Sequence, residues 1–245
     1  MAESYRALCS DFYVNQKVSV KLDLPSTRET VLDLFERVRK TYPDMQSFKR
    51  YEDELALESE VGKAPQKWLA IRSSTIRSGV VNPDSFDDAY GLHRCVLEVA
   101  PYFLSISPLD IEFVELLFGF DLMASGSHDA IVAAALLGDS PLSALLDIEG
   151  GVPIDFQPVF GFRLGDEGDG LQAHFEVKTR SRGSRGHADP ISIYLTVRQN
   201  DPGVGVEQLP GILDRLVEHG QGLVHSTLVP SLLAPVRDAI AASGG

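Results

Sequence analysis

The stretches LQAHFEVKT (171–179) and ISIYLTVR (191–198) decide the fold class of this chain. In both, apolar side chains occupy every second position, and the positions between them are largely polar or charged. Successive side chains of a strand point to opposite sides, so this period of two predicts strands with one buried face. The stretch VSVKLDL (18–24) has the same pattern and predicts a strand near the N-terminus.

Around that first strand, residues 1–104 alternate between strand and helix patterns. Ser26 and Glu29 form a capping box ahead of an apolar stripe at helical spacing, which predicts a helix ending at Pro43. We expect one strand at 48–58 and another at 67–81, the latter with Trp68, Ile71 and Ile76, joined by a hairpin at 59–65. A second helix follows Asn82-Pro83 and includes His93, for which a satisfied core histidine is the expected role.

Residues 105–245 repeat this order. A strand at 111–122 shows a switch of apolar parity, which predicts a bulge near 114–115. Ser127 is expected to cap a helix, and strands follow at 154–164, 171–179 and 191–198. The C-terminal helical region is expected to be broken or kinked near its glycines and prolines, which are Gly220, Gly222, Pro230 and Pro235.

These elements predict an α+β fold of two related strand-helix-strand-strand halves, residues 1–104 and 105–245, an arrangement compatible with one continuous domain. Short connections between successive strands favour a mainly antiparallel sheet. The helices are expected to collect on one face of that sheet.

Composition limits the class of protein. The chain has 245 residues, 44% hydrophobic and 23% charged, which is typical of a soluble globular protein. Two cysteines, Cys9 and Cys95, favour reduced thiols over a disulfide framework. The N-terminus lacks the apolar core of a signal peptide, and the longest apolar run, 130–137, is too short to span a bilayer. We therefore expect a cytoplasmic protein without membrane association.

Charge is segregated along the chain. Residues 82–170 contain sixteen Asp or Glu but only two Lys or Arg, whereas residues 171–198 have a net charge of +3. The chain as a whole carries a net charge of −13, which disfavours nonspecific binding to nucleic acids and anionic membranes. The acidic middle and the basic segment are candidate docking surfaces for a protein partner, or for each other in a homodimer.

Motifs of catalysis or cofactor binding are incomplete. The run 165–170 (GDEGDG) is glycine-rich, and its expected role is a hairpin turn, with a cation site at Asp166, Glu167 and Asp169 as the alternative. The cluster at 125–129 (SGSHD) reads as a helix N-terminus rather than as a catalytic triad. Cys95 follows Arg94, which could lower a thiol pKa, but an ordinary helical cysteine is expected. No catalytic residue, metal ligand or cofactor is assigned.

The candidate binding face comes from the polar parity of the two strands quoted first. We expect the strand 171–179 to present His174 and Lys178 on the same side as Tyr194 and Arg198 of the strand 191–198. The connecting loop would extend this basic face with Arg180, Arg182 and Arg185. Such a face suits phosphate, nucleic acid or an acidic protein segment.

The stretches VSVKLDL and ISIYLTVR, together with the closing segment 213–233, resemble a sporadically distributed, uncharacterised bacterial protein family of about this length. In the closing segment, Leu213-Asp214, a histidine (His219 or His225) and Ser226-Thr227 match the pattern, although the aromatic residue expected before the hydroxyl pair is absent. This resemblance implies no particular activity. The patchy distribution of the family suggests mobile or defence cassettes.

Together, these features favour a non-catalytic interaction or regulatory module that binds a protein partner through charged surfaces. The alternatives are an enzyme acting on a small substrate between the halves and a nucleic-acid-associated module using the basic strip 178–198.

Overall fold

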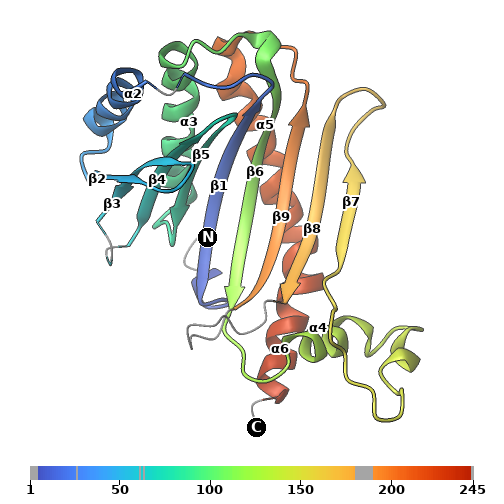
Figure 1. Ribbon diagram of the computed structural model, residues 1–245. Coiled ribbons are helices and arrows are strands. Elements are labelled where there is room, and N and C mark those ends of the chain that lie inside the picture. The colour runs from blue at the N-terminus through green and yellow to red at the C-terminus, as the bar shows by residue number, and fades with distance from the viewer. Residues whose placement is uncertain (1–4, 26, 61, 63, 180–189, 244–245) are drawn as a thin grey trace.

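Alternating apolar residues do form strands, and the strands join into one curved sheet with helices behind it (Figure 1). This computed structural model describes residues 5–25, 27–60, 62, 64–179 and 190–243. Over those residues nine strands follow the order β2-β3-β4-β5-β1-β6-β9-β8-β7, and every neighbouring pair is antiparallel. The strands are β1 (Asp11–Val20), β2 (Met45–Arg50), β3 (Leu55–Ser59), β4 (Gln66–Arg72), β5 (Thr75–Val81), β6 (Ile111–Leu122), β7 (Val159–Arg163), β8 (Leu171–Thr179) and β9 (Ile191–Asn200).

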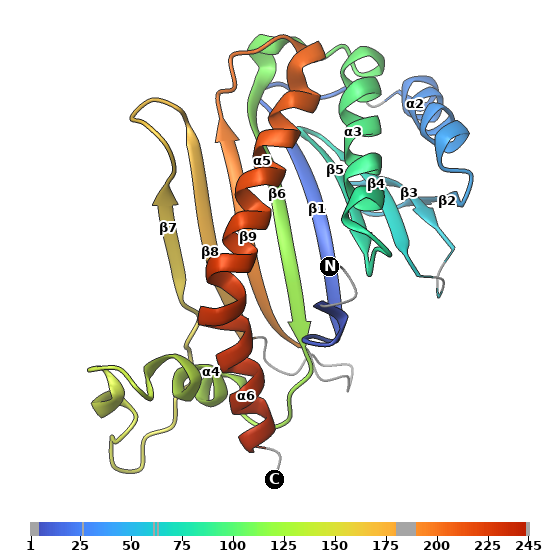
Figure 2. The same ribbon diagram turned by 180° about the vertical axis from the view of Figure 1, so that it is seen from behind.

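The helices lie on one face of the sheet, as Figure 2 shows from behind. The expected α+β class, with an antiparallel sheet, is therefore confirmed. The helices are α2 (Arg28–Thr41), α3 (Phe86–Phe103), α4 (His128–Leu137), α5 (Leu209–Leu223) and α6 (Ala234–Ser243), and a π-helical segment, η4 (Val224–Leu233), joins α5 to α6. Short 3-10 turns are η1 (Pro108–Asp110), η2 (Ser143–Leu145) and η3 (Val206–Gln208).

Two strands expected in the first half were wrong in their extent. The segment 48–58 reverses direction at Tyr51, whose amide donates to the Glu54 carbonyl, so it contributes to both β2 and β3. The segment 67–81 likewise folds back at Ser73-Ser74 to form β4 and β5. A polar run in the middle of an alternating pattern is compatible with either a long strand or a tight hairpin. The hairpins form here because β2 pairs with β3, and β4 pairs with β5, which also pairs with β1.

The expected hairpin at 59–65 is confirmed, because β3 ends at Ser59 and β4 begins at Gln66. The cap of α2 is Thr27, whose hydroxyl accepts from the Thr30 amide, and Ser26 lies outside the described residues. The bulge of β6 lies at Glu112, opposite Ser19 and Val20, which is slightly before the position expected near 114–115. The strand expected at 154–164 is shorter, because only β7 pairs with β8.

The C-terminal helix corrects another expectation. Gly220 and Gly222 do not break it, and the prolines fall inside η4 and at the start of α6, where the chain stays helical. Gly220 instead permits close packing on the sheet: a Cβ there would lie 2.3 Å from the Phe118 ring of β6. Gly220 is thus required because α5 lies too close to the sheet for a side chain at this position. The wider turn of η4 accommodates Pro230 within the helix.

The core lies between the sheet and the helices. Its centre is an aromatic cluster in which the Phe12 and Phe120 rings are 5.0 Å apart, and Tyr5 and Phe86 pack against Phe12. Phe12 and Phe120 face each other across the β1–β6 pair and are almost fully buried. Each such side chain contributes about 1.5–3 kcal/mol through burial, so this cluster anchors the middle of the sheet.

His93 of α3 is fully buried, and its Nδ1 lies 2.8 Å from the Ser78 hydroxyl of β5. The expected core position is confirmed, but only Nδ1 is satisfied, because Nε2 is buried without a hydrogen-bond partner among the described residues. Burial lowers the pKa of His93 from 6.5 to about 3. The neutral ring is therefore the form that the folded chain accommodates.

Substituting Gly220 with Ala should lower the free energy of unfolding by about 1–3 kcal/mol, because the new methyl group would overlap the Phe118 ring. Gly222→Ala is the matched control, since nothing lies within 4 Å of a Cβ there, and it should raise stability by up to about 1 kcal/mol. Urea denaturation of both variants measures the difference. Equal effects at the two positions would contradict the close packing of α5 on β6.

The pKa of His93 predicts a pH-dependent loss of stability. Because the unfolded chain binds a proton below about pH 6.5 and the folded chain only near pH 3, stability should fall with decreasing pH across that window. The contribution is up to about 1.4 kcal/mol per pH unit. Free energies of unfolding measured from pH 7 to 4 should therefore decline less steeply for His93→Gln than for the parent chain. If the free energy of unfolding falls with pH equally in the parent chain and in His93→Gln, then His93 is not the source of this pH dependence.

Candidate functional site

The sheet face turned away from the helices carries most of the polar side chains of the strands, and we call it the open face. In Figure 1 it is turned toward the viewer, with the helices behind the sheet. Strand alternation determines its members: on β1, Val14 and Val18 face the helices, whereas Tyr13, Asn15 and Lys17 lie on the open face. These open-face side chains are partly buried by their neighbours rather than fully solvated.

The structure brings together four of the sequence-predicted binding residues. His174 and Lys178 of β8 pair with Thr196 and Ser192 of β9, and Tyr194 and Arg198 alternate with those partners on the same open face. Lys178 Nζ lies 5.7 Å from the Tyr194 ring centroid. The other predicted members, Arg180, Arg182 and Arg185, lie outside the described residues.

Arg198 also belongs to a second charged group on the open face, whose other members are not among the sequence-predicted binding residues. Glu115 of β6 accepts hydrogen bonds from the Arg198 guanidinium at 2.6 and 2.8 Å, and Lys17 Nζ lies 3.9 Å from its other oxygen. Both cations also lie over the Phe113 ring, at 4.1 Å for Arg198 and 4.8 Å for Lys17. Two positive charges therefore share one carboxylate, and we call these four residues the Glu115 cluster.

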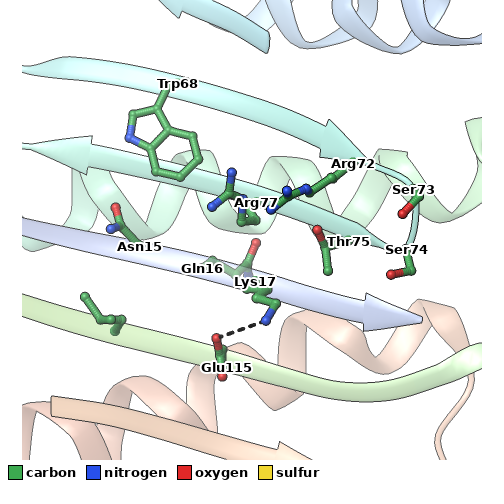
Figure 3. Close-up of a pocket in the computed structure, with 11 residues that line it drawn as sticks. Asn15, Gln16, Lys17, Trp68, Arg72, Ser73, Ser74, Thr75, Arg77 and Glu115 are labelled. Atoms are coloured by element: carbon green, nitrogen blue, oxygen red, sulfur yellow. Dashed lines mark ion pairs between the residues drawn. The ribbon is translucent and has the colours of Figure 1, made fainter. Parts of the chain in front are cut away.

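A pocket of about 490 Å³ lies beside the Glu115 cluster (Figure 3). Its wall comes mostly from β1, β4 and β5, and Glu115 and Leu117 come from β6. Its volume is within the range of small-ligand and side-chain pockets. The remaining lining residues are Asn15, Gln16, Lys17, Trp68, Arg72, Ser73, Ser74, Thr75 and Arg77.

Glycines determine how the aromatic rings lie on the open face. A Cβ on Gly79 would lie 2.3 Å from the Trp68 ring, and one on Gly119 would lie 2.1 Å from the Tyr13 ring. Each ring therefore packs flat over a cross-strand glycine. The sequence pattern groups Trp68 with Ile71 and Ile76 as apolar residues of one strand. The hairpin between β4 and β5 places Trp68 on the open face instead.

Most described cations at the pocket already have carboxylate partners. Arg77 pairs with Glu54, and Arg72 pairs with Asp53. Arg77 also approaches the Trp68 ring, at 5.9 Å from its centroid. The surplus positive charge of this region therefore lies in the Glu115 cluster.

A network of hydrogen bonds lies at the end of the open face where β1 begins and β6 ends. Asp121 of β6 accepts hydrogen bonds from the Tyr13 hydroxyl at 3.2 Å and from the Ser192 hydroxyl at 2.6 Å. Burial raises the pKa of Tyr13, and its hydrogen bond with Tyr194 and the nearby Asp121 charge act in the same direction. Tyr13 therefore stays protonated and serves as a hydrogen-bond donor.

The other sequence candidates have structural roles. Ser127 caps α4 by accepting from the Ala130 amide, and Asp129 accepts from the Phe156 amide and the Thr179 hydroxyl, so the cluster 125–129 is the expected helix N-terminus. Burial raises the pKa of Cys95, which argues against an activated thiol.

The glycine-rich run 165–170 forms the hairpin between β7 and β8, as expected, and Asp169 pairs with Arg215 at 3.2 Å. Among the described residues, no group of three or more His, Cys, Asp or Glu has the geometry of a metal site. Within the same part of the chain, no helix is both long and apolar enough to cross a bilayer.

No protein-family model matches the chain, and no curated protein matches it either. The resemblance drawn from the stretches 18–24, 191–198 and 213–233 therefore stays an expectation.

The packing of Trp68 on Gly79 can be tested by fluorescence, since Trp68 is the single tryptophan of the chain. Gly79→Ala should displace the indole into solvent, shift its emission to longer wavelength and cost about 1–3 kcal/mol of stability. Gly119→Ala is the control: it should cost a similar amount through Tyr13 while leaving the emission unchanged. An unshifted spectrum for Gly79→Ala would refute this packing.

Proposed function

We propose that this chain is a non-catalytic interaction module that binds a protein partner on its open face. The observation that carries the proposal is the Glu115 cluster, in which Lys17 and Arg198 share a single carboxylate. The surplus positive charge can pair with a carboxylate of a partner. Because both cations are about two-thirds buried and packed on the Phe113 ring, they lose little conformational entropy when they bind.

The adjoining pocket supports a protein segment as the ligand. Trp68 and Leu117 provide an apolar wall, and Asn15 and Thr75 provide polar groups, beside the charged cluster. Such a combination suits an acidic residue followed by an inserted aromatic or aliphatic side chain, as at the centre of protein interfaces.

The pairing of the surrounding cations favours a protein over a nucleic acid. Lys178 lies 3.3 Å from Glu176, and Arg72 and Arg77 each have a carboxylate partner. A polyanion would meet these carboxylates as well as the cations, whereas a protein can match both signs.

The free state of Cys9 and Cys95 supports the cytoplasmic location expected from the sequence.

Opposite effects on affinity are expected from the members of the Glu115 cluster. Lys17→Gln and Arg198→Gln should each weaken the partner complex by about two- to tenfold, whereas Glu115→Gln should tighten it, because it frees both cations. Arg39→Gln is the matched control, since Arg39 pairs with Glu36 on α2, away from the open face.

The measurement is quantitative affinity purification from the native host, followed by titration of the captured protein with Trp68 emission as the signal. A photo-crosslinker at Thr196, on the open face, should attach to the same partner, and one at Glu36 should not. If Lys17→Gln, Arg198→Gln and Glu115→Gln all leave capture unchanged, or all reduce it equally, the proposal fails. The triple variant R180E/R182E/R185E tests the sequence-predicted loop separately.

A further inference from the structure

The strand β7 forms one edge of the sheet, and among the described residues no other strand pairs with its outer side. The Val177 amide donates to the Pro158 carbonyl, and the Leu164 amide donates to the Leu171 carbonyl. Antiparallel pairing alternates, so Phe160 and Phe162 also direct their backbone groups toward β8. The N–H and C=O groups of Val159, Gly161 and Arg163 therefore point away from the sheet.

The side chains of β7 are also uncovered. Phe160, Phe162 and Val159 are 46%, 52% and 58% exposed, although Phe160 and Phe162 share the face on which the helices lie. Figure 2 shows the reason: the continuous helical stretch of α5, η4 and α6 packs over β6 and β9 and leaves β7 beside it. An uncovered apolar edge strand is a template for pairing with another strand.

The opposite edge is protected in the way that edge strands of soluble proteins normally are. β2 carries Lys49 and Arg50, and Lys49 pairs with Glu58. Its one large apolar residue that is exposed, Phe48, has 49% of its surface accessible and packs against Phe35 of α2, with ring centroids 5.8 Å apart. On β7, Phe162 packs in the same way against Phe175, with ring centroids 5.9 Å apart. The two edges therefore differ in composition: β7 presents three exposed large apolar residues and β2 presents one, which leaves β7 more open to a strand partner.

We propose that the partner is a second copy of this chain, paired antiparallel through β7. Phe160 and Phe162 flank Gly161 symmetrically, so a two-fold axis through Gly161 sets Phe160 against the partner's Phe162 and Phe162 against the partner's Phe160. These are the close, non-hydrogen-bonded pairs of the ladder, where aromatic side chains pack best. The outward groups of Val159, Gly161 and Arg163 supply the hydrogen bonds.

A strand pair of five residues is smaller than the about 800 Å² per partner that a stable interface buries. The segment that leads into β7 supplies further apolar surface on the same side of the molecule (Figure 1). It lines a groove of about 220 Å³ through Leu145, Ile148 and Val152. Its exposed large apolar residues are Leu142, Leu145, Ile148, Val152 and Ile154.

Pairing of this kind has a structural consequence for the proposed function. Paired residues of an antiparallel ladder point to the same side, so the two sheets would join into one and both open faces would lie on the same side. The dimer would then present two Glu115 clusters to one partner assembly, which raises avidity without any new contact.

Sedimentation of the full chain over a range of concentrations tests the proposal. The parent chain should dimerise, and Phe162→Lys and Val159→Pro should each weaken dimerisation at least tenfold. The first places a charge at the aromatic contact, and the second removes an outward N–H that no bond to β8 uses. Phe48→Lys on β2 is the matched control and should leave dimerisation unchanged.

Salt dependence separates this dimer from one formed by charge attraction. Two copies of net charge −13 repel each other, so association through β7 should be at least as strong at about 0.5 M salt as at low salt. A parent chain that stays monomeric, or a dimer that dissociates in salt, or one that Phe48→Lys disrupts as strongly as Phe162→Lys, would overturn the proposal. Circular dichroism of the variants confirms that they are folded, and the outcome is independent of the Glu115 cluster.

Discussion

The pairing of β1 with β6 is the interaction on which the rest of the molecule depends. These strands come from opposite ends of the first 122 residues, and they pair antiparallel over ten positions. One side of the pair forms the aromatic centre of the core through Phe12 and Phe120, and the other side places Lys17 opposite Glu115. A shift of one residue in this register would exchange the two sides, so the core and the open face are specified together.

The close approach of aromatic rings to the backbone is the second constraint, and glycines make it possible. Gly220 lets α5 lie against Phe118, and Gly79 and Gly119 let Trp68 and Tyr13 lie flat on the open face. In each case an aromatic ring occupies the space of a missing side chain, on both faces of the sheet. The positions of the rings, and hence the wall of the pocket, follow from where the backbone has no Cβ.

Helix coverage decides which surfaces remain for binding. The helices cover the middle of one face, and in the part of the chain that the structure describes no helix lies over the other face or over β7. The open face is polar and ion-paired, whereas the β7 edge is apolar. The two surfaces therefore suit different contacts, charge recognition on the first and strand pairing on the second.

Local patterns determined much of the fold: the alternation in 171–179 and 191–198 specified β8, β9 and their buried sides, and Ser127 specified a helix start. The same alternation placed His174, Lys178, Tyr194 and Arg198 on one face, because parity is a local property. Only the tertiary structure decided that Lys17 and Arg198, 181 positions apart, meet at Glu115, since strand order depends on pairing between distant segments. It also decided the hairpins at Tyr51 and Ser73 and the place of Trp68, because a polar break in an alternating run does not reveal whether the chain continues or turns back.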